Sequence, residues 1–160
     1  MGTTKITAEP GAPFIDIERE FDAPVELLYR AHTEPDLLKQ WLGAMYEMTI
    51  EEYDPHDGGR WRYTHHAPNG ESYGFHGVFH GEPSTQGMLQ TFEFDGAPGH
   101  VSLDGLTFEP SGRKTIVRVH SVHQSVEARD AMVESGMERG INAGYAKLDA
   151  LLARLAVPVA

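Results

Sequence analysis

The stretch SVEARDAMVESGMERGINAGYAKLDALLARL, residues 125–155, is the one long segment of the sequence with an unbroken helical period. Its apolar side chains recur every three or four residues, the spacing that places them on one face of a helix. Ser135 and Glu138 have the form of a capping box, which marks a helix N-terminus. The segment is therefore predicted to divide into a short helix over residues 126–134 and a longer helix from Gly136.

Three glycines, Gly136, Gly140 and Gly144, follow one another at intervals of one turn in the middle of this segment. Each glycine inside a helix costs about 0.5 to 1 kcal/mol relative to alanine, so something in the fold should offset that cost. Two explanations are open at this stage. The glycines either let the helix lie close against a sheet, or they leave room for a bound molecule beneath it.

The chain before this segment reads mostly as strands and turns, because the apolar period changes from 3.6 to two. Consecutive strands with short connections favour an antiparallel meander, and an alternating segment near the N-terminus adds one more strand. About seven strands are expected in all, forming a curved sheet around the C-terminal helix in an α+β fold. The predicted strands are residues 14–21, 46–53, 60–66, 72–82, 87–94, 101–109 and 114–123.

Two short helices are predicted between the first strand and the meander. Pro24 is suited to the first position of a helix, and Thr33 with Asp36 forms a second possible capping box before an apolar turn that Gly43 ends. Residues 1–13 are polar and rich in proline and glycine, so we expect a mobile leader followed by a single domain over residues 14–157.

Strand alternation also indicates which side chains face inward. Aromatic residues gather on one face of three consecutive strands, as a curved sheet with an aromatic concave side requires. In the strand over residues 101–109, Val101 and Leu103 are out of phase with Leu106 and Phe108. A bulge at Gly105 that switches the face is therefore predicted.

Composition excludes several classes of function. The chain has 160 residues, 40% of them hydrophobic, which suffices for one domain with a core and a cavity. A net charge of −11 argues against binding to nucleic acid or to an anionic membrane surface. The absence of cysteine excludes disulfides and thiolate chemistry. The sequence has no apolar stretch of about 20 residues and no hydrophobic signal region. We therefore expect a cytoplasmic protein that does not insert into a membrane.

The nine histidines form no recognisable metal motif. His76 and His80 share one face of their strand, but that face is opposite the aromatic side chains, so we predict neither a metal site nor a cofactor. His65 and His123 lie on inward faces, where a general base near a ligand would stand. The sequence lacks a nucleophile elbow, a phosphate-binding glycine loop and a dinucleotide fingerprint.

The order of elements and several short motifs resemble the START-like superfamily, also called SRPBCC, over residues 14–155. Within it, the sequence is similar to the branch named after the C-terminal domain of the activator of the ninety-kilodalton heat-shock chaperone ATPase. One departure is Ile141, where many relatives have a tryptophan, and this exchange could enlarge the cavity under the helix. The motifs that support the resemblance are Phe21-Asp22-Ala23-Pro24, Gln40-Trp41-Leu42-Gly43, Gly58-Gly59-Arg60-Trp61-Arg62-Tyr63, Tyr73-Gly74-Phe75-His76-Gly77, Thr91-Phe92-Glu93-Phe94 and Gly144-Tyr145-Ala146-Lys147-Leu148.

The resemblance implies a helix-grip fold with a deep apolar cavity between sheet and helix, used in the superfamily for hydrophobic molecules. It implies no particular reaction, since fold alone does not settle function. A mixture of apolar walls and few polar tips suits a small-molecule pocket, although large side chains could also fill the space as a core. The residues assigned to ligand binding are Trp41, Trp61, Tyr63, His65, Tyr73, Phe75, Phe79, Phe92, Phe94, Phe108, His123, Met132, Met137, Gly140 and Tyr145, with Leu28 beside them.

Three functions follow as hypotheses. The first is non-enzymatic binding of a small hydrophobic molecule, which the inward aromatic residues favour. The second is a cyclase, dehydratase or hydrolase-like enzyme on a polyketide-type ligand, with His65, Tyr63 or His123 as acid or base. The third is a chaperone cofactor or stress-response interaction protein, which rests on the family resemblance alone. The oligomeric state has no signal in the sequence.

Overall fold

The computed structural model describes residues 2–156 and contains a single antiparallel sheet over that range. Strand β8 lies between β2 and β7, and the meander then runs outward to β3, in the order β1-β2-β8-β7-β6-β5-β4-β3. The bounds are β1 Lys5–Thr7, β2 Phe14–Phe21, β3 Glu47–Tyr53, β4 Arg60–His66, β5 Ser72–Val78, β6 Gly87–Phe94, β7 Val101–Ser111 and β8 Lys114–Val122.

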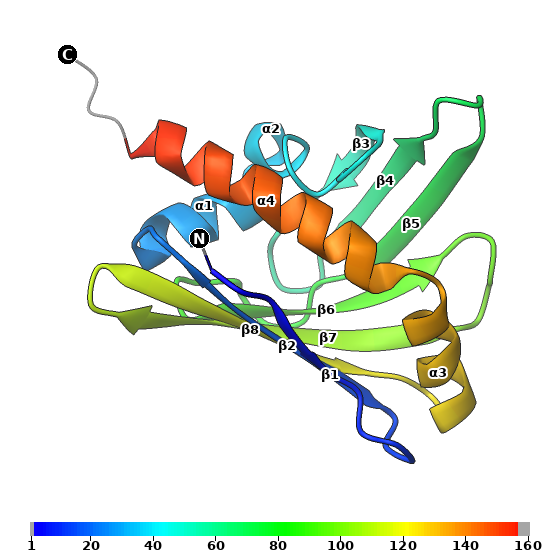
Figure 1. The fold of residues 1–160 in the computed structure, drawn as a ribbon. Coiled ribbons are helices and arrows are strands. Elements are labelled where there is room, and N and C mark those ends of the chain that lie inside the picture. The colour runs from blue at the N-terminus through cyan, green and yellow to red at the C-terminus, as the bar shows by residue number, and fades with distance from the viewer. Residues whose placement is uncertain (1, 157–160) are drawn as a thin grey trace.

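Four helices accompany the sheet in the described residues: α1 Val25–Thr33, α2 Pro35–Leu38, α3 Val126–Glu134 and α4 Met137–Leu155. Figure 1 shows α4 lying across one side of the curved sheet, with α1 and α2 beside its C-terminal half and α3 at its N-terminal end. This arrangement confirms the predicted helix-grip fold. None of these helices combines the length and the apolar character needed to cross a membrane.

The sheet has eight strands, one more than predicted, because part of the expected leader is a strand. Strand β1 pairs with β2 at the edge of the sheet, with Ile6 opposite Ile17. The predicted leader over residues 1–13 thus contains a strand at residues 5–7, which are too few to show an alternating period. Met1 and the last predicted residue of the domain, Val157, lie outside the described residues.

The division of the C-terminal segment into two helices is confirmed, but both predicted capping boxes are wrong. The Ser135 hydroxyl donates back to the Met132 carbonyl at 2.6 Å, and the Thr33 hydroxyl donates to the Tyr29 carbonyl at 2.7 Å. Each hydroxyl therefore satisfies the end of the preceding helix. The break between α3 and α4 falls at Gly136, whose φ of 90° is a left-handed conformation that favours glycine.

The predicted bulge at Gly105 is also wrong. Strand β7 keeps a regular register with both β6 and β8, so its alternation continues without a switch of face. Leu103 consequently points outward and is 41% exposed, whereas Ser102 is buried. Asp104 shares the inner face with Ser102 and Phe108, and a carboxylate thus lies on the concave side of the sheet.

The C-terminal half of α4 is packed firmly into the core. Leu148, Leu151 and Leu152 are each at most 2% exposed. On the same half, Asp149 accepts two hydrogen bonds from the Arg19 guanidinium of β2, at 2.8 and 2.5 Å. The guanidinium also lies 4.5 Å from the centre of the Phe21 ring. A bidentate, partly buried ion pair therefore fixes this half of the helix to the sheet.

A cavity under the N-terminal half of α4

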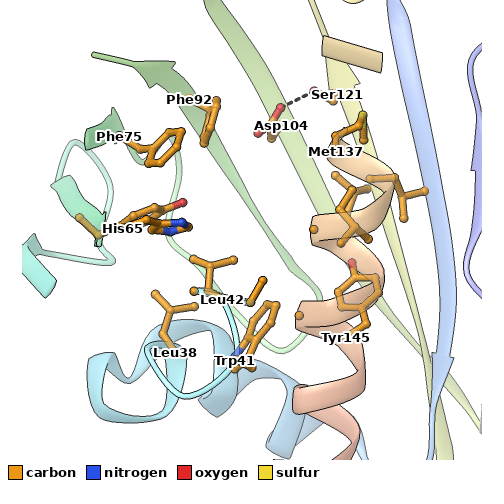
Figure 2. A pocket seen from close by; sticks show the side chains of 18 of the residues that line it. Leu38, Trp41, Leu42, His65, Phe75, Phe92, Asp104, Ser121, Met137 and Tyr145 are labelled. Carbon is orange, nitrogen blue, oxygen red and sulfur yellow. Dashed lines mark hydrogen bonds between the residues drawn. The ribbon is translucent and has the colours of Figure 1, made fainter. Parts of the chain in front are cut away.

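A cavity of about 680 Å³ lies between the N-terminal half of α4, the segment after α2 and the concave face of the sheet. Figure 2 shows Phe75, Phe92 and His65 on one side of this space, and Met137 and Tyr145 of α4 on the other. Leu38, Trp41 and Leu42 close it from below in that view. Its walls are mostly aromatic and aliphatic, as in pockets for small molecules.

Ten of the fifteen residues predicted to bind a ligand line this cavity. They come from five elements and the segment after α2, which the fold brings together around one space. The ten are Trp41, Trp61, Tyr63, His65, Phe75, Phe92, Met132, Met137, Gly140 and Tyr145. Ile141, the position where many relatives were expected to carry a tryptophan, lines the cavity as well.

Two of the remaining predicted residues, Phe79 and Phe108, belong to the core instead. They are 0% and 3% exposed, and Leu28 is likewise fully buried. Phe79 follows the last residue of β5 and packs edge-on against Tyr53, with ring centres 5.5 Å apart. These side chains face inward as predicted, but neighbouring side chains fill the space in front of them.

Two more, Tyr73 and Phe94, lie beyond the cavity at the far end of the aromatic face. The Tyr73 hydroxyl donates to the Glu71 carboxylate, and its ring stacks on Tyr46 at 6.2 Å. Phe94 packs against Phe75, with ring centres 5.2 Å apart. Both extend the aromatic cluster outward, so alternation assigned the correct face but not the limit of the cavity.

Aromatic rings form a continuous wall on the β4–β6 side. Trp61 and Tyr63 stack with ring centres 4.8 Å apart, and Phe75 and Phe92 stack at 5.4 Å. His65 stacks on Tyr63 at 5.3 Å, which extends the wall by one more ring. Rings that pack on one another lose little freedom when a ligand arrives, so the wall is pre-formed for binding.

The two explanations for the glycines each apply to a different glycine. A methyl group added at Gly144 would lie 3.2 Å from the Trp41 carbonyl oxygen, so this glycine allows a close contact. At Gly140 the same methyl group would meet no heavy atom of the described residues within 4 Å. Gly140 faces the cavity, and its missing side chain leaves open space there.

A carboxylate enters the cavity from the middle of the sheet. Asp104 Oδ1 accepts hydrogen bonds from Ser121 Oγ at 2.6 Å and Ser102 Oγ at 3.1 Å. Figure 2 shows the Asp104–Ser121 pair between Phe92 of the aromatic wall and Met137 of α4. Burial raises the pKa of Asp104, and the two serine hydroxyls oppose that shift only in part.

Sequence reasoning missed Asp104 because an aspartate in a strand normally faces water. The available signal was its spacing of four from Phe108, which places both side chains on one face of a regular strand.

His123, the last predicted residue, stands behind this carboxylate and does not line the cavity. Its Nε2 lies 3.3 Å from Ser121 Oγ, and burial lowers its pKa. The serine hydroxyl therefore lies between the histidine and the aspartate. In a Ser-His-Asp triad the histidine lies between the other two groups and removes the serine proton. The observed order does not provide that function.

Three further polar groups in the wall bear on the chemistry of the cavity. His65 Nε2 and Trp61 Nε1 are buried without a hydrogen-bond partner in the described residues. Burial lowers the pKa of His32 to about 4, and its Nδ1 lies 2.7 Å from the Leu28 carbonyl. His32 is thus neutral near pH 7. Sequence analysis did not assign it, since it follows a helical rather than a strand period.

No cluster of three or more histidine, aspartate or glutamate side chains that could hold a metal ion occurs within residues 2–156. The polar side chains that line the cavity include Gln90, Asp104, Ser121 and His65. Their arrangement suits hydrogen bonding to an organic molecule more than coordination of an ion.

Strand order, two short helices after β2 and a long helix over a cavity define a START-like protein of the SRPBCC superfamily. A family model described as activator of Hsp90 ATPase homolog 1-like protein matches residues 22–153, and the chain belongs to that family. This agrees with the branch named from the sequence motifs. A comparison with curated proteins gives no significant match.

Solved structures support the same assignment. A protein of Rhodobacter sphaeroides is 30% identical, with 94% of this chain and 99% of that chain covered and a TM-score of 0.85. Proteins of Mycobacterium smegmatis and Arthrobacter aurescens also have TM-scores of 0.85, at 22% and 23% identity. The matches cover 95% of this chain in both cases, and 97% and 92% of the other chains. At these lower identities the likeness shows the fold alone.

Proposed function

We propose that the protein binds a small, mostly apolar molecule in the cavity under α4. A volume of about 680 Å³ falls within the range of roughly 300–1,000 Å³ typical of small-molecule sites. The stacked rings of Trp61, Tyr63, Phe75 and Phe92 offer it a rigid apolar surface. Such a site removes apolar ligand surface from water, which is the main driving force for binding.

The observation that carries this proposal is the open space in front of Gly140. A helix interior loses about 0.5 to 1 kcal/mol at a glycine, and here no close packing against the described residues compensates for the loss. An alanine would fit without a clash. The glycine is therefore best explained by a molecule that occupies the space when bound.

Catalysis and chaperone interaction are less well supported. Of the three acid or base candidates, Tyr63 and His65 stand in the wall without a paired nucleophile, and burial raises the pKa of Tyr63 and lowers that of His65. His123 is behind the cavity. The chaperone hypothesis rests on the family description alone, which names a chaperone ATPase activator.

The test compares two leucine substitutions on α4. Gly140→Leu places an isobutyl group in the cavity, whereas Asn142→Leu places the same group on the exposed face of the same helix. Each protein is titrated with N-phenyl-1-naphthylamine, an apolar dye that fluoresces when it leaves water.

We expect saturable binding by the wild type and by Asn142→Leu, and a loss of at least about tenfold in affinity for Gly140→Leu. Thermal unfolding of all three proteins confirms that each is folded. If the wild type shows no saturable binding, or if both variants bind as the wild type does, the cavity is not the binding site and the proposal fails.

A further inference from the structure

Three polar side chains form one row across the inner face of the sheet. Gln90 of β6 is the register partner of Asp104 of β7, and Asp104 is the register partner of Ser121 of β8. All three line the cavity. Cross-strand partners have neighbouring side chains on the same face, so the row is a continuous polar strip on an otherwise apolar floor.

The hydrogen bonds of this row leave one side of the carboxylate free. Both serine hydroxyls donate to Oδ1 of Asp104, and no described donor bonds Oδ2. The Gln90 side-chain amide also lacks a hydrogen-bond partner within residues 2–156. Two acceptors, Asp104 Oδ2 and Gln90 Oε1, are therefore available to a molecule in the cavity.

Asp104 forms no ion pair with a described cation; His123 lies close enough to interact with its charge, but burial lowers the pKa of that imidazole. Among the described residues that line the cavity, Arg139 is the one lysine or arginine. Arg139 is exposed, and neither it nor Asp104 forms a described ion pair. A partly buried carboxylate without a cation is costly, and a cationic ligand would remove that cost. Burial lowers the pKa of His32 and His65 and raises that of Tyr53, Tyr63 and Tyr145, so these cavity-lining rings are neutral near pH 7 and carry no charge that could offset the carboxylate.

We propose that the ligand is an amphiphilic amine whose ammonium group binds Asp104 and Gln90 and whose apolar body lies on the aromatic wall. This inference rests on the proposed function, since it names the chemical class of the molecule in the same cavity. Phe92 is the register partner of Ser102, one pleat from Asp104, so the aromatic wall begins beside the polar row. Ring faces near an ammonium also attract its charge.

An amine satisfies the polar row better than the other common head groups. An ammonium offers three donors and a positive charge, whereas an alcohol offers one donor and no charge. A carboxylate head group would meet Asp104 with like charge and would be repelled. The net charge of −11 also draws cations toward the protein and lowers the local concentration of anions.

Three probes of nearly equal size test this inference: 2-(2-naphthyl)ethylamine, 2-(2-naphthyl)ethanol and 2-propylnaphthalene, each measured by displacement of N-phenyl-1-naphthylamine at pH 7. The proteins are the wild type, Asp104→Asn and Glu138→Gln. Asparagine keeps the oxygen that accepts from both serines. Glu138→Gln removes one negative charge from the exposed face of α4 and controls for net charge.

We expect the wild type to bind the amine at least about tenfold more tightly than 2-propylnaphthalene, with the alcohol between them, because charge-assisted hydrogen bonds are the strongest. Asp104→Asn should weaken the amine by about tenfold or more and leave 2-propylnaphthalene within about twofold. Glu138→Gln should resemble the wild type for all three probes.

The outcomes separate the two proposals. If the wild type binds all three probes equally, or if Asp104→Asn does not weaken the amine, the amine inference is overturned while cavity binding stands. If the wild type shows no saturable binding of the dye, both proposals are overturned. A change in amine affinity of equal size in Glu138→Gln would reduce the effect to net charge and would also overturn the inference.

Discussion

The two halves of α4 differ sharply although they belong to one continuous helix with one apolar stripe. In the C-terminal half, Leu148 is fully buried and Asp149 is held by Arg19. In the N-terminal half, Met137 is half-buried and Gly140 faces open space. Figure 1 shows the C-terminal half beside α1 and α2, and the N-terminal half running across the sheet toward α3. The same sequence pattern therefore serves packing at one end and a cavity at the other.

This difference shows that packing of half of the helix is enough to hold it on the sheet. Close packing of the C-terminal half fixes the position of α4, and the N-terminal half then remains over the cavity without filling it. Substitutions in the C-terminal half should cost stability, whereas those in the N-terminal half should change binding with little loss of stability. Three predictions test that division, and a fourth tests the carboxylate on the sheet side of the cavity.

The largest effect is expected for truncation of a buried leucine. Leu148→Ala should lower the free energy of unfolding by about 2–5 kcal/mol, because it removes packed methyl groups and leaves a void. Met137→Ala, at the edge of the existing cavity, should cost less than about 1 kcal/mol. Urea unfolding of both variants measures the difference. Equal losses would contradict the division of the helix.

The ion pair of the C-terminal half comes next. The Arg19 side chain is only 6% exposed, and Asp149→Asn removes its charged partner. The free energy of unfolding should therefore fall by about 2–3 kcal/mol. The double variant Arg19→Met, Asp149→Leu should recover most of that loss, since apolar side chains of similar volume remove the unpaired charge. Denaturant titration checks both values. If the double variant is less stable than the single one, the pair contributes more than its desolvation costs.

Substitution of Gly140 should give a smaller effect, and one that raises the free energy of unfolding instead of lowering it. Gly140→Ala should raise the free energy of unfolding by about 0.5–1 kcal/mol, because alanine favours the helix and the space is open. Gly144→Ala should give no gain, since its methyl group would lie 3.2 Å from the Trp41 backbone oxygen. Thermal and urea unfolding of the two variants provide the comparison. A gain from Gly144→Ala as large as that from Gly140→Ala would show that the close contact relaxes freely.

The smallest effect is a change in pH dependence at Asp104. The pKa of this carboxyl is raised in the folded state above its ordinary value of 3.8, so the wild type loses stability as the pH rises from about 3.8, and the loss is complete above the folded pKa. Asp104→Asn should therefore be more stable than the wild type at neutral pH. The gain should shrink as the pH falls and vanish below about 3.8, where both states bind the proton.

Unfolding of both proteins measured from pH 3 to pH 8 tests this expectation. A gain from Asp104→Asn that grows toward low pH would mean that the carboxylate is stabilised by the fold, contrary to the direction assigned to its pKa.

Most of the fold follows from the sequence, because long segments show a clear period. Seven strands, the paired short helices and the break at Gly136 were all indicated by spacing and by turn residues. The strand over residues 5–7 could not be predicted, since three residues show no period and their pairing with β2 is a tertiary contact. The caps were misjudged because Ser135 and Thr33 can bond either the helix before or the helix after them.

The candidate site was predictable in its apolar part and not in its polar part. Alternation placed Trp61 and Phe75 on the cavity face, but it placed Phe79 there as well, because period alone does not show which side chains neighbours will cover. Asp104 was missed for a physical reason. An aspartate in a strand normally faces water, and the apolar side chains of this strand change phase near Gly105, so the sequence predicted a bulge where the strand in fact continues.

The central claim, that a molecule occupies the space under the N-terminal half of α4, is tested most directly by native mass spectrometry. Wild type, Gly140→Leu and Asn142→Leu are purified from the organism's own cells, and their masses are measured under native and denaturing conditions. We expect a discrete extra mass on the wild type and on Asn142→Leu that is lost on denaturation, and its absence from Gly140→Leu. A wild-type protein without added mass, or the same added mass on all three proteins, would contradict the claim.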